Sequence, residues 1–214
     1  MTTMLIDHIG AFVLLPWLQA GNVGADFDRW ELVYTIMRSI GRFAFPLFCF
    51  LIVQGFIHTS NVQRYITRLG LFALISEIPF DLAKSNVLLE FSYQNVMFTL
   101  LAGLLALWAI KNIQNVTLRL LLVLACLMSV ELLHTDYGAL GVAVIIILYS
   151  LRDYRLFQSM AGAIAFIGSR FAMPAFILTY FYNGQKGRLN SKLFYLFYPI
   201  HLLIMANVAY LLIH

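Results

Sequence analysis

Apolar residues gather in runs of helical length along this chain, and short polar segments separate the runs. The runs lack the alternation of apolar and polar positions that strands show, so the pattern predicts helices rather than a barrel. Nine helical segments are expected, at residues 4–19, 33–57, 67–83, 95–110, 118–133, 138–151, 156–169, 172–182 and 193–213. Several of these segments are shorter than the roughly 17–25 residues of a full membrane crossing. The expected number of transmembrane helices is therefore about nine, within a range of about 8–10.

Composition places these segments in a lipid bilayer. Of the 214 residues, 62% are hydrophobic and only 11% are charged, whereas a soluble domain carries about 25% charged residues. A soluble chain of this length could not bury so much apolar surface. We therefore expect an all-α, polytopic integral membrane protein that forms a single transmembrane domain over residues 1–214.

The basic residues outside the apolar runs are distributed unevenly between alternate connections. One set of connections holds nine of them, and the other holds three. The first set is Arg64, Arg68, Lys111, Arg119, Arg152, Arg155, Lys186, Arg188 and Lys192, and the second is Arg29, Lys84 and Arg170. The positive-inside rule then predicts a cytoplasmic N-terminus and an external C-terminus. Because this rule explains the net charge of +4, that charge does not indicate nucleic-acid binding.

Ionisable residues inside the apolar runs are the strongest indication of a functional site. A central Arg or Asp costs roughly 2.5–3.5 kcal/mol on insertion scales, so such residues usually face a bundle interior or a wet cavity. The ionisable residues are Asp7 and His8 in the first run, Arg38 and Arg42 in the second, Glu77 and Asp81 in the third, and His201 in the last. They predict a site within the membrane. No cleavable signal peptide is expected, because acidic and imidazole side chains interrupt the first run.

Two pairs of these residues have helical spacing. Arg38 and Arg42 are four residues apart and share a helix face, and so do Glu77 and Asp81. Two guanidinium groups on one intramembrane face need anions, which Asp7, Glu77, Asp81 or a phosphate-bearing ligand would supply. The alternative is a purely structural network of ion pairs.

The neighbours Asp7 and His8 suggest acid–base chemistry. The pKa of an imidazole lies near neutrality, so His8 is suited to take a proton from an attacking nucleophile. Adjacent residues on a helix point about 100° apart, so Asp7 is free to pair with Arg38 or Arg42 instead of the His8 ring. A polar pair at a helix end near the cytoplasmic interface is the alternative interpretation.

The connections supply further candidates. Asp136 begins the segment DYGALG and is suited to cap a helix, and Asn95 is suited to hydrogen bonding between helices. The aromatic and basic stretch YFYNGQKGR, residues 180–188, is typical of an aromatic belt beside a cytoplasmic loop, and it is also suited to hold a nucleotide diphosphate. No His, Cys or Asp set has the spacing of metal ligands, so no metal is expected.

Taken in order, the motifs resemble those of the TraX family, and the resemblance covers nearly the whole chain. They are MLIDHIGAF, IGRFAFPLFCFLIVQGFIHT, RLGLFALISEIPFDLA, NVMFTLLAGLLAL, DYGALGV, YFYNGQKG and LFYLFYPIHLLI. The family is named for a conjugal-transfer protein that acetylates the N-terminus of F-type pilin. It also resembles, more loosely, the transmembrane acyltransferases that transfer acetyl groups from coenzyme A (CoA) with a membrane-embedded His.

The resemblance implies a multi-pass acetyltransferase of the bacterial inner membrane, with acetyl-CoA as co-substrate. The acceptor would be an amine or a hydroxyl, with a pilin or peptide N-terminus, a sugar or a lipid all open. The implied catalytic residues are His8 as general base, with Asp7, Arg42 and His201. The implied substrate or CoA-binding residues are Arg38, Glu77, Asp81, Asn95, Asp136, Tyr182, Asn183, Lys186 and Arg188.

A small proton-coupled transporter is the main alternative, because transporters also carry intramembrane Asp, Glu, Arg and His. The chain has no visible internal repeat, which many transporters have. A non-catalytic scaffold is a third and weaker hypothesis, since it gives no reason for buried charges.

Overall fold

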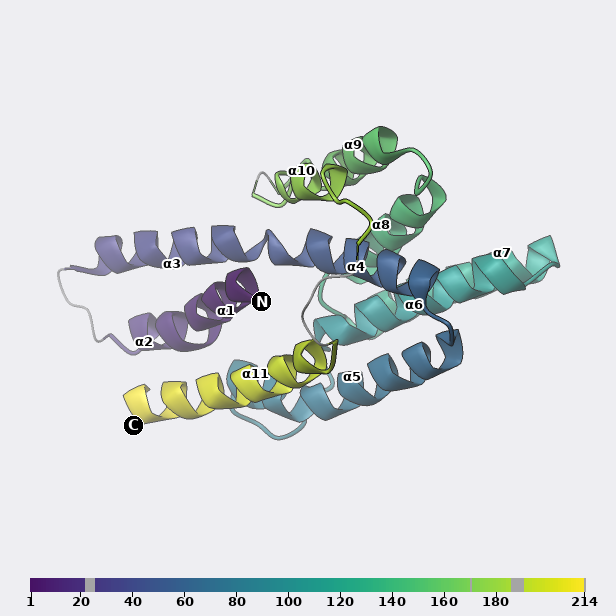
Figure 1. Ribbon diagram of the computed structural model, residues 1–214. Coiled ribbons are helices and arrows are strands. Elements are labelled where there is room, and N and C mark those ends of the chain that lie inside the picture. Colours follow the sequence, from purple (N-terminus) through teal and green to yellow (C-terminus); the bar gives the residue numbers. More distant parts are fainter. Residues whose placement is uncertain (22–25, 170, 186–190, 214) are drawn as a thin grey trace.

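The structure is a computed structural model that describes residues 1–21, 26–169, 171–185 and 191–213. Within these residues the fold is helical, and the one recorded β contact is an isolated parallel bridge between Gln94 and Thr135. The all-α prediction is thus confirmed (Figure 1).

The helices follow the predicted segments closely. In chain order they are α1 (Thr2–Ile9), the π-helical turn η1 (Gly10–Leu14), α2 (Leu15–Gln19), α3 (Phe27–Gly41), α4 (Ala44–His58), α5 (Val62–Ser85), α6 (Val96–Asn112), α7 (Val116–Leu132), α8 (Gly138–Ser150), α9 (Arg155–Ala165), α10 (Ala175–Tyr180) and α11 (Ser191–Ile213). The least accurate prediction is the segment 172–182, where only six residues are helical, in α10.

Two of the expected segments are interrupted, in both cases near a proline. The segment 33–57 is divided into α3 and α4 by a turn at Arg42 and Phe43. Proline lacks a backbone N–H and its ring clashes with the carbonyl four residues earlier, so Pro46 prevents a regular bond to the carbonyl of Arg42. The first segment contains the π turn η1 just before Pro16, whose ring acts in the same way on Phe12.

Two helical stretches are long and apolar enough to cross a bilayer on length and composition. They are Phe27–His58, which combines α3 and α4, and Leu193–Leu212 in α11. Among the other described helices, α6 and α8 are apolar but shorter. The helical character of the apolar runs is therefore confirmed for the described residues, and the number of crossings stays a prediction.

Helix α5 is amphipathic in the reverse sense to a helix on a soluble protein. Its outward face carries large apolar side chains that are 45–63% exposed, which are Leu71, Leu74, Ile75 and Ile78. Its inward face buries polar side chains, which are Ser76, Glu77 and Asp81. An exposed apolar stripe over a buried polar face is the arrangement that a lipid environment favours over water.

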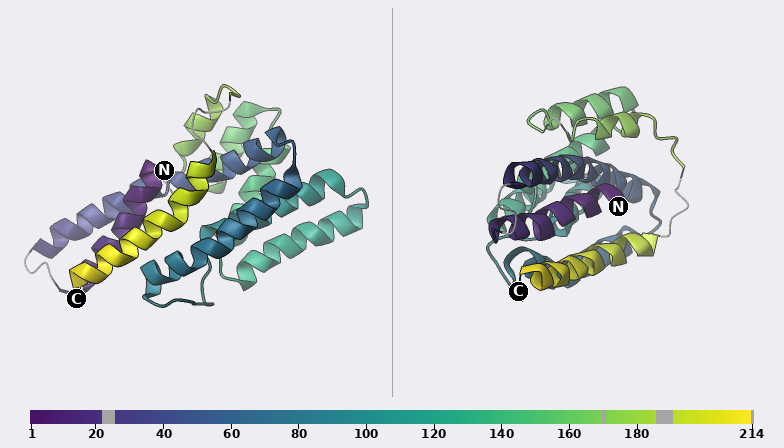
Figure 2. Two further views of the ribbon diagram at one scale, coloured as in Figure 1. Left: turned by 60° about the horizontal axis from the view of Figure 1, so that its bottom comes forward. Right: turned by 90° about the vertical axis from the view of Figure 1, so that its left-hand side faces the viewer.

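The ends of the helices form two sets (Figures 1 and 2). The α4–α5 and α6–α7 connections, which hold the basic residues around Arg64 and Lys111, lie at one end of the molecule. The α2–α3 and α5–α6 connections lie toward the opposite end, and so does the C-terminus. These two basic connections thus lie away from the C-terminus, and the orientation in the membrane stays a prediction.

The core centres on α4 and the helices around it. Phe45, Val53 and Phe56 of α4 are buried with the inner faces of α6, α8 and α11. Close approach of α6 and α8 depends on Gly103, because a Cβ atom there would lie 2.3 Å from Ile145. The helices α1 and α2 lie alongside α3 and α11 (Figure 2), and Met4 of α1 belongs to the core.

Candidate functional site

Small residues bring α1 against α3. A Cβ atom at Gly41 would lie 2.1 Å from the side chain of Asp7, and one at Gly10 would lie 3.2 Å from Met37. Because Gly41 has no side chain, the carboxylate of Asp7 can lie directly on the backbone of α3 at the end of that helix. The N-terminal helix therefore places its polar residues beside the break between α3 and α4.

The side chain of Asp7 forms an ion pair with Arg38. Arg38 Nη1 lies 2.7 Å from Asp7 Oδ1, and the two side chains are 36% and 19% exposed. This contact confirms the interpretation that Asp7 pairs with an arginine rather than with the imidazole of the next residue. Asp7 thus neutralises Arg38, one of the two arginines predicted to share a helix face.

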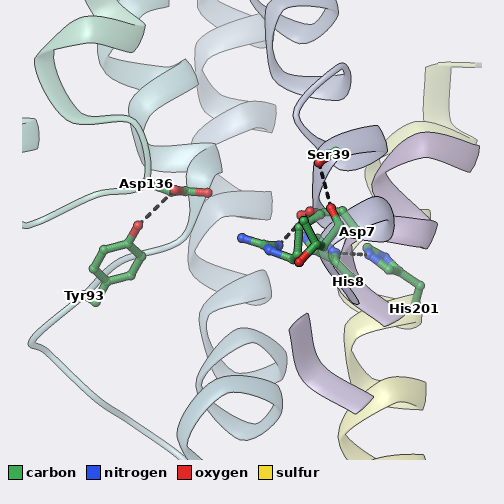
Figure 3. Close-up of polar contacts among 8 residues, drawn as sticks. Asp7, His8, Ser39, Tyr93, Asp136 and His201 are labelled. Atoms are coloured by element: carbon green, nitrogen blue, oxygen red, sulfur yellow. Dashed lines mark hydrogen bonds and ion pairs between the residues drawn. The ribbon is translucent and has the colours of Figure 1, made fainter. Parts of the chain in front are cut away.

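His8 meets a second histidine from the far end of the chain. His8 Nδ1 lies 2.6 Å from His201 Nε2 of α11, and the two ring planes differ by only 5° (Figure 3). His201 Nδ1 in turn lies 2.6 Å from the carbonyl oxygen of Phe197. The structure therefore brings together two of the four predicted catalytic residues in a hydrogen-bonded chain.

This chain of contacts determines which nitrogen atoms carry protons. A carbonyl oxygen only accepts, so His201 Nδ1 donates to Phe197 and His201 Nε2 is the acceptor when that ring is neutral. His8 Nδ1 must then donate to His201 Nε2. In a neutral imidazole the remaining nitrogen, His8 Nε2, bears a lone pair. The assigned network thus leaves one basic nitrogen that neither neighbour uses.

Aromatic side chains surround the histidine pair. The ring of Phe12 lies 5.2 Å from that of His8, and the ring of Tyr198 lies 6.1 Å from it. His201 is 4% exposed. A base among such neighbours is held in one orientation and partly shielded from water.

The cluster lies midway along the two longest apolar stretches. Gly41, which Asp7 contacts, is near the middle of Phe27–His58, a stretch of 32 residues and about 48 Å at 1.5 Å per residue. His201 is near the middle of Leu193–Leu212. In a bilayer that these stretches crossed, the histidine pair would lie close to the midplane.

A second polar contact joins the α5–α6 and α7–α8 connections. The hydroxyl of Tyr93 donates to Asp136 Oδ1 over 2.9 Å (Figure 3). Burial raises the pKa of Asp136, while the hydrogen bond from Tyr93 and the positive charges of Arg38 and Lys84 oppose that rise. The influence of Arg38 on both Asp7 and Asp136 indicates that the second contact lies within electrostatic range of the first.

An unusual backbone holds Asp136 in place. Tyr137 and Gly138 both have positive φ angles, of 65° and 43°, and Tyr137 stacks on Phe45 with ring centroids 3.6 Å apart. A non-glycine residue in this region is strained and persists only where its surroundings fix it. The prediction that Asp136 caps the next helix is wrong, because Tyr137 occupies the N-cap position of α8 and the first-turn N–H of Ala139 donates to Glu131 Oε1 instead, over 2.6 Å.

Glu77 and Asp81 bind the backbone and side chains of the α5–α6 connection. Glu77 Oε2 accepts hydrogen bonds from the side-chain and backbone nitrogens of Asn95, and Asp81 Oδ2 accepts one from the backbone N–H of Glu90, 2.8 Å away. Neither carboxylate pairs with an arginine within the described residues, so the expected ion-pair network with α3 is confined to Asp7 and Arg38. The described part of the chain contains no group of three or more His, Cys, Asp and Glu side chains placed to hold a metal ion.

Arg42 differs from Arg38. It follows the last residue of α3, and its side chain is exposed. Among the described residues its guanidinium makes no ion pair, although its charge reaches Asp7. Arg42 is thus a cation near the cluster that the described residues leave uncommitted.

The predicted residues of the α10–α11 connection lie apart from the histidine pair. The ring of Tyr182 packs on Phe50 of α4, its carbonyl accepts a hydrogen bond from Arg155, and Asn183 Oδ1 accepts one from the backbone N–H of Gln185, 3.0 Å away. Lys186 and Arg188 lie outside the described residues.

Sequence reasoning missed two elements of this arrangement. The first is Tyr93, which donates to Asp136. It lies two residues before the candidate Asn95, so its neighbourhood was the available signal. The carbonyl of Phe197, which sets the orientation of His201, carries no signal in the side-chain pattern.

Comparison with known proteins gives a family. The family described as "TraX protein" matches residues 1–209. A protein described as "Probable fimbrial assembly protein FimC, serogroup H1", from Dichelobacter nodosus, is 34% identical, and the match covers 81% of this chain and 83% of that protein. No solved structure matches.

Proposed function

Because this chain belongs to the TraX family, we propose that it is a membrane-embedded acyltransferase that moves an acetyl group from acetyl-CoA to an amine or hydroxyl. The observation that carries the proposal is the chain of contacts from His8 through His201 to the carbonyl of Phe197. This chain of contacts leaves His8 Nε2 with a free lone pair, near the middle of the two stretches that are long enough to cross a bilayer.

The membrane setting of this proposal rests on which side chains the fold exposes. Helix α5 turns leucine and isoleucine outward and carboxylates inward, and Phe27–His58 is long enough to cross. We infer a multi-pass protein of the bacterial inner membrane whose basic connections and N-terminus are on the cytoplasmic side. Acetyl-CoA would enter from that side.

In the proposed reaction His8 Nε2 takes a proton from the acceptor amine or hydroxyl. The freed electron pair forms a bond to the carbonyl carbon of the thioester, which gives a tetrahedral oxyanion. When that intermediate collapses, the carbon–sulfur bond breaks and the sulfur of CoA takes the proton from His8. His201 Nε2 accepts a hydrogen bond from His8 throughout, so it holds the imidazole in orientation and stabilises the transient imidazolium.

Arg42 is the predicted residue best placed to stabilise the oxyanion. Asn95 is less suited, because its two amide protons already go to the carbonyl of Ala73 and to Glu77. His201 is less suited as well, because both of its ring nitrogens already make hydrogen bonds. The guanidinium of Arg42 has no ion-pair partner among the described residues, so it is free to bind an anion.

The acceptor to test first is the N-terminal amine of a pilus subunit. The D. nodosus relative is described as a fimbrial assembly protein. A pilin N-terminus is an amine, which the proposed base would deprotonate. Sugar hydroxyls and lipid amines belong in the same assay as competing acceptors.

The test is acetyl transfer by the purified protein in detergent or nanodiscs. Labelled acetyl-CoA is offered with N-terminal pilin peptides, the same peptides with a blocked N-terminus, an aminosugar and a phospholipid amine. We expect mass spectrometry to find one acetyl group on a single acceptor class. A folded, monodisperse sample that acetylates none of them and does not hydrolyse acetyl-CoA would contradict the proposal.

A proton-coupled carrier is the second candidate function, favoured by a specific observation. Glu77 Oε1 and Asp81 Oδ1 are buried without a hydrogen-bond partner among the described residues, as expected of carboxyl groups that bind and release protons. CoA separates the two functions. It should stabilise an acyltransferase by about 2.7 kcal/mol at a hundredfold excess over its dissociation constant, whereas a carrier has no reason to respond.

A further inference from the structure

A groove with polar and apolar walls lies at the start of α5, and its volume is about 410 Å³. The start of α5 is at the end of the molecule where the α4–α5 and α6–α7 connections lie (Figure 1). The walls come from the first three turns of α5 and the residue before them, and they consist of Asn61, Gln63, Arg64, Thr67, Arg68, Leu71 and Phe72. The groove is separate from the histidine cluster, and no part of the proposed chemistry uses it.

Two tyrosines hold the guanidinium of Arg68 in place. Its central carbon lies 4.9 Å from the ring centroid of Tyr195 on α11 and 5.7 Å from that of Tyr65 on α5. Tyr195 itself packs against Phe72, with ring centroids 5.1 Å apart. A guanidinium that stacks on aromatic faces keeps its edge free to donate hydrogen bonds. Arg68 is thus a preoriented donor rather than a freely moving surface side chain.

The charge of this groove is not balanced within the described residues. Arg64 and Arg68 are four residues apart on one helix face, and neither makes an ion pair there. The backbone N–H groups in the first turn of α5 add partial positive charge. The N–H of Arg64 donates to Asn61 Oδ1 over 2.9 Å. Two like charges held together in this way favour a multivalent anion.

We propose that this groove binds the phosphate groups of a ligand, with Arg64 and Arg68 as the donors and Tyr195 as the support of Arg68. The identification of this ligand as the nucleotide end of acetyl-CoA rests on the acyltransferase function proposed above. Six residues, about 9 Å of helix, separate Tyr195 from His201 along α11. A nucleotide anchored in the groove would leave its pantetheine arm to extend along α11 toward His8.

The first experiment compares two donors. Wild type and the double variant R64Q/R68Q are assayed with acetyl-CoA and with acetyl-pantetheine, which has no phosphate. We expect the KM for acetyl-CoA to rise about tenfold or more for each lost guanidinium, with kcat nearly unchanged. The KM for acetyl-pantetheine should not change. R119Q, which removes a basic residue at the same end but outside the groove, is the matched control and should behave like wild type.

A binding measurement identifies the source of the phosphate without any turnover. Adenosine 3′,5′-bisphosphate is titrated into wild type and R64Q/R68Q in phosphatidylcholine nanodiscs, and in discs that also contain phosphatidylglycerol. Binding that the double variant loses in both discs assigns the groove to a nucleotide. If wild type does not bind the nucleotide, but the double variant binds less phosphatidylglycerol than wild type does, the groove is assigned to a lipid headgroup.

The two proposals fail in different ways. A protein that binds the bisphosphate through Arg64 and Arg68 but transfers no acetyl group would keep the phosphate site and overturn the acyltransferase. A protein that transfers acetyl groups with the same KM in wild type and R64Q/R68Q, and whose variant retains phosphatidylglycerol, would keep the acyltransferase and overturn the phosphate site.

Discussion

The histidine pair and the side chain of Asn95 both make polar contacts between distant parts of the chain, and they differ in whether one of their own polar atoms stays unbonded. Both amide protons of Asn95, its side-chain oxygen and its backbone N–H are bonded, to Ala73, Glu77 and Met97. In the histidine pair, three ring nitrogens are bonded, and His8 Nε2 has no hydrogen-bond partner among the residues that the structure describes. A residue whose polar atoms are all hydrogen-bonded stabilises the fold, whereas a network that leaves one basic nitrogen with a free lone pair can also take part in proton transfer.

His201 should have the largest effect among the residues that support His8. His201→Ala removes the acceptor that orients the base, so we expect turnover to fall about 100-fold or more, the scale of positioned acid–base catalysis. His201→Gln retains a side-chain oxygen that can accept from His8 Nδ1 and should recover part of the activity. Initial rates and thermal melts of both variants provide the check. Equal losses in Ala and Gln variants with unchanged melting would contradict the positioning role.

Asn95→Ala should affect stability rather than chemistry. It removes the side-chain donor to a buried carboxylate oxygen of Glu77 and leaves only the backbone N–H of residue 95, 3.4 Å away. We expect this loss to cost about 2 kcal/mol in the free energy of unfolding. Asn112→Ala is the matched control, because the amide of Asn112 donates to a helix carbonyl at an exposed position. Unfolding monitored with a thiol-reactive or tryptophan probe compares the two. A stable Asn95→Ala protein with impaired turnover would place Asn95 in the catalytic machinery instead.

Gly41→Ala tests the contact between α1 and α3. The added methyl group would meet the side chain of Asp7, so the ion pair with Arg38 must shift at a cost of about 2 kcal/mol. At Gly168 a Cβ atom would meet nothing within 4 Å, and Gly168→Ala is therefore the control. Melting temperature and acetyl-CoA turnover are measured for both. If the two variants are indistinguishable, the close packing at Gly41 does not position Asp7.

Asp136→Asn should give the smallest effect, and one that depends on pH. Burial raises the pKa of Asp136 in the folded state, so the ionised carboxylate destabilises the fold, and stability is lost as the pH rises from the ordinary Asp pKa of about 3.9 through the raised value. Asparagine cannot ionise and still accepts from Tyr93. We expect equal melting temperatures near pH 4 and a variant more stable by about 2–4 °C at pH 7.

The control for this prediction is Asp153→Asn, at an exposed carboxylate whose side chain is 73% accessible. Its melting temperature should differ little from that of wild type at any pH. An Asp136→Asn protein that is less stable than wild type at pH 7 would mean that the ionised carboxylate stabilises the fold.

Helix positions were accessible from the sequence because apolar runs determine them. The prediction of 118–133 agrees with Val116–Leu132 to within two residues at each end, and 95–110 agrees with Val96–Asn112 equally well. The turn between α3 and α4 was missed because Gly41 and Pro46 lie within an otherwise apolar run. Hydropathy does not register a proline that removes one backbone hydrogen bond.

The candidate site was predicted in its residues but not in its pairings. Asp7 and Arg38 were candidates for an ion pair because few countercharges exist inside the runs, and the structure contains that pair. The contact of His8 with His201 joins residues 193 positions apart, and no local pattern encodes such a contact. The αL conformation of Tyr137 was equally hidden, since that region is rarely occupied by aromatic residues.

The most direct test of His8 as the catalytic base compares CoA binding and acetyl-CoA turnover in wild type and His8→Ala, measured on the same purified samples. We expect saturable binding in both proteins, with transfer and slow hydrolysis present in wild type and lost in the variant, because His8 supplies the base and not the donor site. Normal turnover by a folded His8→Ala protein would contradict the assignment of His8, and the absence of CoA binding by folded wild type would contradict acyl transfer itself.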